Sequence, residues 1–233
     1  QSLGSMDPRT NEGMELIAST WRHLSPDDQA ELQEQLVALY RGEIRYLDDQ
    51  LSKLWMYLRA SEALEDTLVV FWTDHGEQFW EHGEIHHDRS LFGQENRGMA
   101  AFWSRDLSSP QDWTGPTVHQ DIFPTILDAL EVPGEVPVSG DVLGTRSSGK
   151  VRTAFRYSSP DPPRMAADLD GLRLHYAWDG SRALYDASSD PDEVNDLYDV
   201  EDPGLAVLWE HLDSEIDQAL EFLPHLEPVD RGL

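Results

Sequence analysis

The sequence predicts an α/β fold in which a long helix precedes short buried strands and the chain closes on antiparallel strands. Residues 25–61 repeat apolar side chains every three or four positions, which is the period of an amphipathic helix. Residues 66–73 and 97–104 are short apolar runs rich in β-branched and aromatic residues, as in buried strands. Short alternating segments after residue 150, separated by turn sequences, predict the antiparallel strands.

The long helix has a clear predicted start. Ser25 can act as the N-cap, Pro26 suits the first helical position, and Asp27 and Asp28 complement the helix dipole in the first turn. An apolar stripe continues along the helix and predicts one core-facing side. Its members are Leu32, Leu36, Leu39, Tyr40, Ile44, Leu47, Leu51, Leu54, Trp55 and Leu58.

The order of the remaining segments predicts the domain organisation. The strands at 66–73 and 97–104 are expected in a parallel sheet buried on both faces, and residues 117–132 form a second amphipathic helix that starts or bends near Pro124. We therefore expect an α/β core over residues 14–132 and a Gly, Pro and Ser-rich linker over 133–150. Residues 151–233 would form a small antiparallel β subdomain and a closing helix at about 204–222.

The charge balance of the chain disfavours some classes of binding partner. Forty-five acidic and 17 basic residues give a formal net charge of -28, which opposes binding to nucleic acid or to an anionic membrane surface. No apolar run approaches the roughly 20 residues of a membrane span. The chain has no cysteine, so disulfides, thiolate zinc sites and a cysteine nucleophile are excluded within it. The acidic residues are spread along the chain and indicate a solvated acidic surface suited to high salt.

Polar residues with metal-binding chemistry follow the first predicted strand. Ligands of open α/β sheets lie outside the carboxyl ends of the strands, and the sequence TDHGE stands at such an end. Asp74 offers an oxygen ligand, His75 offers a nitrogen ligand, and Gly76 lets the backbone turn tightly beside them. The alternative is that Asp74 caps a turn and His75 is an ordinary polar loop residue.

Three further histidines follow within twelve residues of His75. His82, His86 and His87 could supply a ligand, a general acid or a contact to an anionic substrate, or could simply be solvated. Arg89 is a nearby cation that could hold an oxyanion through two hydrogen bonds, or could pair with a surface carboxylate.

Four segments together carry a family resemblance. In order they are YRGEIRYLDDQLSKLWMYLRASEALEDTLVVFWTDHGEQFWEHG, SLFGQENRG, VHQDIFPTILDALEVPGEVPVSGD and ALYDASSDPDEVNDLYD. Over about residues 38–200 they resemble the C-terminal half of the sulfatase family, within the alkaline-phosphatase-like superfamily. The resemblance implies the C-terminal part of an α/β sandwich with a small antiparallel β subdomain.

The resemblance also implies roles for single residues. Asp74 and His75 become ligands of a divalent ion, for which calcium is the family's usual choice, while the imidazole ligand suits manganese or zinc. His87 falls where relatives carry a histidine near the transferred group, and His82 is a second candidate for that catalytic role.

Two substrate contacts complete the expected site. His86 and Arg89 are the candidates for binding the anionic part of the substrate. The sequence departs from the family pattern by placing His75 where many sulfatases have asparagine, and by lacking an evident lysine soon after the second His-Gly pair.

The implied function is metal-dependent hydrolysis of a sulfate ester on a small molecule or glycan. The family's nucleophile is a formylglycine made in a CxPSR-like or SxPSR-like motif of the N-terminal half, and neither motif occurs here. We therefore expect a C-terminal fragment that is catalytically incomplete without the missing N-terminal half. Two alternatives remain: a phosphodiesterase, phosphonate hydrolase or phosphotransferase of the same superfamily, or a non-catalytic binding module.

Overall fold

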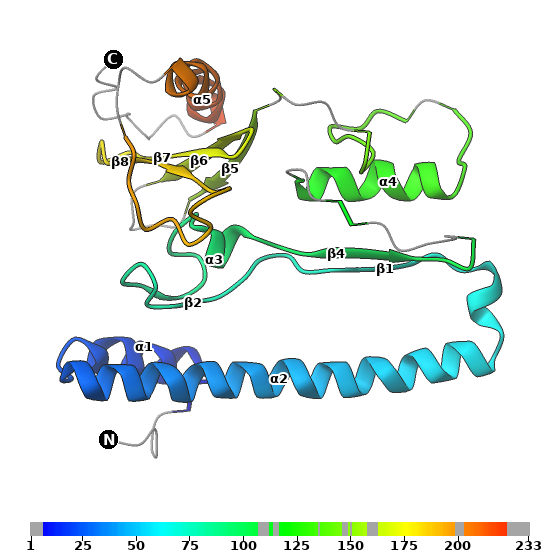
Figure 1. Ribbon diagram of the computed structural model, residues 1–233, viewed down its shortest axis with the longest axis horizontal. Coiled ribbons are helices and arrows are strands. Elements are labelled where there is room, and N and C mark those ends of the chain that lie inside the picture. Colours follow the sequence, from blue (N-terminus) through cyan, green and yellow to red (C-terminus); the bar gives the residue numbers. More distant parts are fainter. Residues whose placement is uncertain are drawn as a thin grey trace. The chain divides into compact units, whose positions relative to one another are not determined.

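The computed structural model describes residues 7–106, 112–113, 117–134, 136–145, 149, 151–157, 163–198 and 203–222 (Figure 1). It confirms the predicted α/β class. The chain divides into two compact units. Unit 1 comprises residues 1–71, 77–89 and 101–109, and unit 2 comprises residues 72–76, 90–100 and 110–233.

Unit 1 is built on two N-terminal helices. Helix α1 (Asn11–Trp21) begins at Thr10, whose hydroxyl oxygen accepts a hydrogen bond from the Gly13 N–H. Helix α2 (Pro26–Ala60) begins at Ser25, whose hydroxyl accepts from the Asp28 N–H at 3.3 Å. Both are N-caps that satisfy donors at a helix start. The predicted long helix and its cap are therefore confirmed.

The core of unit 1 covers only the first part of the α2 stripe. Ile17, Leu32, Leu36 and Ile85 are buried together. Later members of the predicted stripe are exposed to solvent in this structure: Leu39, Tyr40, Ile44, Leu47 and Leu54. The prediction that the whole stripe packs into a core is wrong for the described chain, because the buried cluster of unit 1 gathers around the N-terminal turns of α2.

The two predicted buried strands pair with each other. Helix η1 (Ala63–Asp66) leads into β1 (Val69–Trp72), and β1 forms a two-stranded sheet with β4 (Ala100–Trp103). These strands are less buried than predicted: Trp72 is 52% exposed, and the first two residues of β4 are exposed. The reason is that, within the described residues, neither strand has a second neighbour.

A second two-stranded sheet precedes β4 in the sequence. It consists of β2 (Gln78–Phe79) and β3 (Ile85–His86), which are antiparallel. The short helix α3 (Gly93–Asn96) follows it. The predicted helix at 117–132 is present as η2 (His119–Asp121) and α4 (Ile122–Ala129), so it does start near Pro124.

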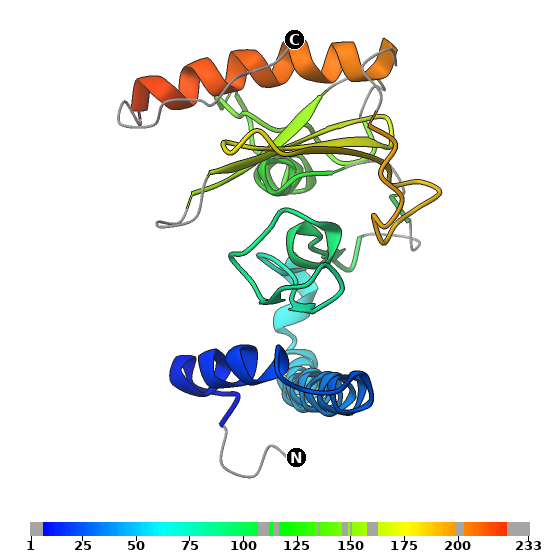
Figure 2. The same ribbon diagram turned by 90° about the vertical axis from the view of Figure 1, so that its left-hand side faces the viewer.

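Unit 2 contains a four-stranded antiparallel sheet, as predicted for the C-terminal part. Its strands β5 (Arg152–Arg156), β6 (Arg164–Leu169), β7 (Leu172–Ala177) and β8 (Arg182–Asp186) are adjacent in chain order. Helix α5 (Pro203–Phe222) lies across one face of the sheet (Figure 2). The core between them is apolar and contains Met165, Leu174, Tyr176, Leu184, Leu205, Leu208, Trp209 and Leu212.

Buried polar groups fix the connection between α4 and the sheet of unit 2. The Asp121 carboxylate accepts hydrogen bonds from the Val118 and Asp141 backbone N–H groups at 3.0 and 2.9 Å. Asp141 in turn accepts from the Arg152 guanidinium at 2.6 Å. None of the helices in the described part of the chain combines the length and apolar composition needed to cross a membrane.

Candidate functional site

Asp74 and His75 form the first group of candidate site residues. They follow β1 after one residue, Thr73, and belong to unit 2. Oδ2 of Asp74 lies 3.7 Å from Nε2 of His75, and Oδ1 of Asp74 accepts a hydrogen bond from the His75 backbone N–H at 2.9 Å. The Asp74 side chain is 85% exposed. Two potential ligand atoms are therefore held side by side at the end of the strand.

The protonation of both groups suits metal binding. Nδ1 of His75 is 2.9 Å from the Gly76 carbonyl oxygen. A carbonyl oxygen only accepts, so this contact places the imidazole proton on Nδ1 and leaves the lone pair on Nε2. The hydrogen bond from the His75 backbone N–H, assisted by one from the Asp74 backbone N–H, holds the pKa of Asp74 below its ordinary value. Asp74 is thus ionised near neutral pH.

The loop after β1 is fixed by close backbone contacts within unit 2. The Gly76 N–H donates to the Glu95 carbonyl oxygen at 2.7 Å. A Cβ atom at Gly76 would lie 2.1 Å from the carbonyl oxygen of Gln94, so only glycine fits there. At Thr73, the residue before Asp74, the carbonyl oxygen lies 2.9 Å from Nε2 of His119. The chain therefore presents Asp74 and His75 from a defined turn.

The second group of candidates lies on the β2–β3 hairpin of unit 1. Gln78 pairs with His86 and Phe79 pairs with Ile85. The connecting turn is closed by a hydrogen bond from the Trp80 N–H to the Glu84 carbonyl oxygen at 2.7 Å. Trp80 of the hairpin packs against the end of α1, because its ring stacks on that of Trp21 with centroids 3.6 Å apart.

The hairpin brings Glu77, His86 and His87 together. Oε2 of Glu77 lies 3.2 Å from Nδ1 of His87, and Oε1 of Glu77 lies 3.7 Å from Nδ1 of His86. The two imidazole rings are 4.1 Å apart between centroids. The three side chains are 21 to 34% exposed. One ligating atom from each residue lies within 4.8 Å of the others, so the three could hold a metal ion.

The register and one unusual backbone angle explain this convergence. Continuing the observed pairing by one residue places Glu77 opposite His87, on the same face of the hairpin. In a regular strand His86 would point to the other face, because successive side chains alternate. His86 instead has φ of 79°, in the left-handed region that non-glycine residues seldom adopt. We attribute the position of its ring beside that of His87 to this local break in alternation.

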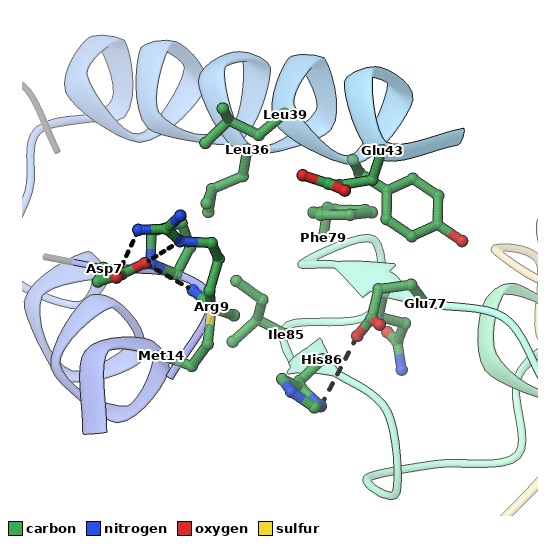
Figure 3. A pocket seen from close by; sticks show the side chains of 13 residues that line it. Asp7, Arg9, Met14, Leu36, Leu39, Glu43, Glu77, Phe79, Ile85 and His86 are labelled. Atoms are coloured by element: carbon green, nitrogen blue, oxygen red, sulfur yellow. Dashed lines mark hydrogen bonds and ion pairs between the residues drawn. The ribbon is translucent and has the colours of Figure 1, made fainter. Parts of the chain in front are cut away.

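A cavity adjoins this group within unit 1 (Figure 3). Its volume is about 640 Å³, and Glu77 and His86 contribute to its wall. Arg9 also lines the cavity and makes a two-point ion pair with Asp7, from Nε at 2.8 Å and Nη2 at 2.9 Å. The rest of the lining is largely apolar: Met14, Leu36, Leu39, Tyr40, Phe79 and Ile85.

The other predicted site residues are not part of either group. His82 lies in the turn of the β2–β3 hairpin and is half-buried, and Arg89 follows the hairpin as an exposed residue. The site prediction omitted Glu77, although it is the fourth residue of the DHGE sequence that contains Asp74 and His75. The hairpin register that places Glu77 beside the histidines pairs Phe79 with Ile85, and it is known from the structure rather than from the sequence pattern.

Comparison with known proteins defines the family. The family model described as Sulfatase matches residues 8–132, which include both groups of candidate residues. The chain belongs to the sulfatase family. The resemblance found in the sequence is confirmed, and so is the fold class.

Two proteins with similar sequences carry different names. Arylsulfatase K of Bos taurus is 24% identical over 200 residues, which are 78% of this chain and 35% of the relative. The multifunctional alkaline phosphatase superfamily protein PehA of Trinickia caryophylli is 32% identical over 208 residues, covering 78% of this chain and 39% of the relative. The chain thus spans little more than a third of these proteins.

Solved structures agree on the fold. A putative sulfatase from Bacteroides thetaiotaomicron matches with a TM-score of 0.68 at 16% identity, over 82% of this chain and 44% of that one. A protein solved in complex with its substrate D-glucosamine-2-N,6-O-disulfate matches with a TM-score of 0.56 at 17% identity, over 97% of this chain and 55% of that one. At these identities the similarity establishes the architecture.

Proposed function

We propose that this chain contributes part of the active site of a metal-dependent sulfatase that hydrolyses sulfate esters. The observation that carries the proposal is the Asp74–His75 pair: two ligand atoms 3.7 Å apart, on a fixed turn, in a chain of the sulfatase family. An ionised carboxylate and an imidazole with its lone pair on Nε2 fit a divalent cation. Calcium is the expected ion, with manganese or zinc as alternatives.

The bound ion would neutralise charge on the sulfate oxygens and favour nucleophilic attack. His87 is the residue we assign to the leaving group or to the sulfate. Its Nδ1 lies 3.2 Å from Glu77 Oε2, and since a carboxylate only accepts, the proton on that nitrogen is directed to Glu77. Nε2 is then the ring nitrogen that would act on the substrate, and Glu77 would orient the ring.

His82, His86 and Arg89 have secondary roles in this proposal. His82 is the alternative general acid, and His86 and Arg89 are candidate contacts for the anionic part of the substrate. A sulfated small molecule or glycan is the proposed substrate class, supported by the sulfated glucosamine bound by one structural relative. The nucleophile, a formylglycine, and the remaining metal ligands would come from sequence outside these 233 residues, in keeping with the third of each relative that the chain covers.

Phosphoryl or phosphonyl transfer is a second candidate function. It is favoured by the 32% identical relative, which is named as a multifunctional member of the alkaline phosphatase superfamily. Sulfate and phosphate esters present similar tetrahedral anions, and the same fold serves several chemistries. The two functions are separated by the ratio of kcat/KM for an aryl sulfate to kcat/KM for the matching aryl phosphate and phosphonate esters.

The test is substitution of Asp74 in the intact protein that contains this chain. Asp74→Ala should lower kcat/KM for the aryl ester by more than about 100-fold, beyond the 10–100-fold typical of residues that only support a ligand. Unfolding should change little because the side chain is exposed. Asp48→Ala, which removes an exposed carboxylate of α2, is the matched control and should retain activity. Near-normal turnover of Asp74→Ala would refute the assignment.

A further inference from the structure

We infer that Glu77, His86 and His87 bind one zinc ion. This site shares no ligand with the Asp74–His75 pair and involves a different set of donors, two imidazoles and one carboxylate. The same donor set with an open fourth position is found in catalytic zinc sites. The distances from the Glu77 oxygens to the two Nδ1 atoms, 3.2 and 3.7 Å, suit atoms that are each about 2 Å from a common ion.

A carboxylate oxygen of Glu77 that lacks a hydrogen-bond partner supports a cation site at this position. Oε1 of Glu77 is buried and accepts no hydrogen bond from the described residues. The nearest imidazole nitrogen of His86, at 3.7 Å, is too far for a hydrogen bond. A buried carboxylate oxygen without a donor loses its hydration with nothing to replace it, which destabilises the folded state. A cation between Glu77 and the two rings would remove this cost.

The protein also maintains an unfavourable backbone angle at the same point. His86 has φ of 79°, in the left-handed region that is unfavourable for a residue with a Cβ atom. The angle accompanies the placement of the His86 ring beside His87, where both nitrogens face one carboxylate. Glu77 and His86 also line the cavity of about 640 Å³, which lies beside the group.

The ligand chemistry selects zinc over the hard cations. Calcium and magnesium require mostly oxygen ligands, whereas two imidazoles and a carboxylate suit zinc. Zinc would displace the proton that His87 shares with Glu77. Zinc on Nδ1 would fix the His87 ring and remove it from its proposed role toward the substrate, so bound zinc should inhibit ester hydrolysis. This inhibition, unlike the binding itself, rests on the proposed function of His87.

The experiment is titration of the chain with zinc chloride, followed by isothermal calorimetry. The buffer contains calcium and magnesium at millimolar concentration. The hard cations occupy carboxylates of the acidic surface, which would otherwise bind zinc nonspecifically in a chain of net charge -28. We expect one zinc site that persists under these conditions and also in Asp74→Ala, which removes a ligand of the other candidate zinc site. His86→Asn should weaken it by more than about 100-fold, since loss of a ligand exceeds the 10–100-fold effect of supporting residues.

The variants separate ligand loss from misfolding. Asparagine tolerates the left-handed backbone of His86 and leaves the net charge unchanged. Glu77→Gln keeps the size of the side chain and should weaken zinc at least tenfold. His23→Ala removes an exposed histidine of the same unit and should have no effect. Equal thermal midpoints of the zinc-free variants establish that each is folded, and His87→Gln replaces His86→Asn if the latter unfolds.

Each outcome decides the assignment. A site that survives His86→Asn or His87→Gln in a folded protein, or that is displaced by magnesium, overturns it. The proposed function is tested separately by zinc inhibition of ester hydrolysis in the intact protein. A zinc site without inhibition would support the site and contradict the role of His87. Inhibition that persists in folded His86→Asn would contradict inhibition through this site, since zinc could then act at Asp74 and His75.

Discussion

The carboxylate of Glu193 lies 2.7 Å from the Arg173 guanidinium in the interior of unit 2. Glu193 is 1% exposed and also accepts a hydrogen bond from the Gly93 N–H at 3.1 Å. Arg173 makes a second ion pair, with Asp168 at 2.7 Å. The network connects the β subdomain to the segment that includes α3, within one unit. It belongs to the scaffold that presents the loop of Asp74, since the Gly76 N–H donates to Glu95 of α3.

Removing the charge of Glu193 should destabilise the protein strongly. Glu193→Gln keeps the size of the side chain but leaves Arg173 with one buried partner fewer, and breaking such a pair costs about 3 kcal/mol in the free energy of unfolding. Urea unfolding followed by circular dichroism measures the loss. The exposed neighbour Asp192 provides the control, because Asp192→Asn should change stability by less than about 0.5 kcal/mol. Equal effects of the two substitutions would contradict the importance of the buried pair.

The same carboxylate should make stability depend on pH in the acid range. Burial raises the pKa of Glu193, but contact with His175 and the charge of Arg173 outweigh burial and bring the pKa below its ordinary value of 4.5. Folding therefore favours the ionised form. The stabilisation is complete above pH 4.5 and is lost as the pH falls from 4.5 through the pKa of the folded state. The difference in unfolding free energy between wild type and Glu193→Gln should narrow over that range. A difference that is constant from pH 6 to pH 3 would contradict the lowered pKa.

Gly76 should tolerate no side chain. An added Cβ would lie 2.1 Å from the Gln94 carbonyl oxygen, which is backbone and cannot turn aside. Gly76→Ala should therefore cost about 2 kcal/mol in the free energy of unfolding, as overpacking does, and should reduce ester hydrolysis in the intact protein by displacing Asp74 and His75.

Gly42 is the matched control for this substitution. It lies within α2, where an added Cβ meets no atom within 4 Å. Gly42→Ala should stabilise the protein by about 0.5–1 kcal/mol because alanine restricts the unfolded chain and favours helix. If Gly76→Ala were as stable as wild type, the close contact with Gln94 would not exist in solution.

The sequence was sufficient for the features that depend on local patterns. Ser25 and Pro26 predicted the start of α2, and Asp179 and Gly180 predicted the turn between β7 and β8, where Gly180 has φ of 87°. The closing helix predicted at about 204–222 is α5. Each of these follows from backbone preferences of the residues themselves. The division of the chain at 133–150 stays a prediction.

The Glu77 cluster could not be predicted in the same way. It depends on which residue of one strand faces which residue of the next, and on a left-handed angle at His86 that no preference of histidine requires. The burial of the α2 stripe was overestimated for a related reason. Periodicity shows which side of a helix is apolar, but Ile44 and Leu54 are covered only if another segment lies against them.

Salt should stabilise this chain. Forty-five acidic residues against 17 basic ones leave a net charge of -28, and repulsion among like charges opposes the compact state. Exposed pairs such as Arg45–Asp49, at 3.7 Å, offset little of it. Raising sodium chloride from 0.05 M to 1 M shortens the screening length to about 3 Å. The gain in the free energy of unfolding should be on the order of 1 kcal/mol, or about 2–4 °C in the thermal midpoint for a chain of this size.

Potassium chloride should act equally, since screening depends on ionic strength. A midpoint that falls with salt would show that ion pairs, rather than repulsion, dominate the surface electrostatics.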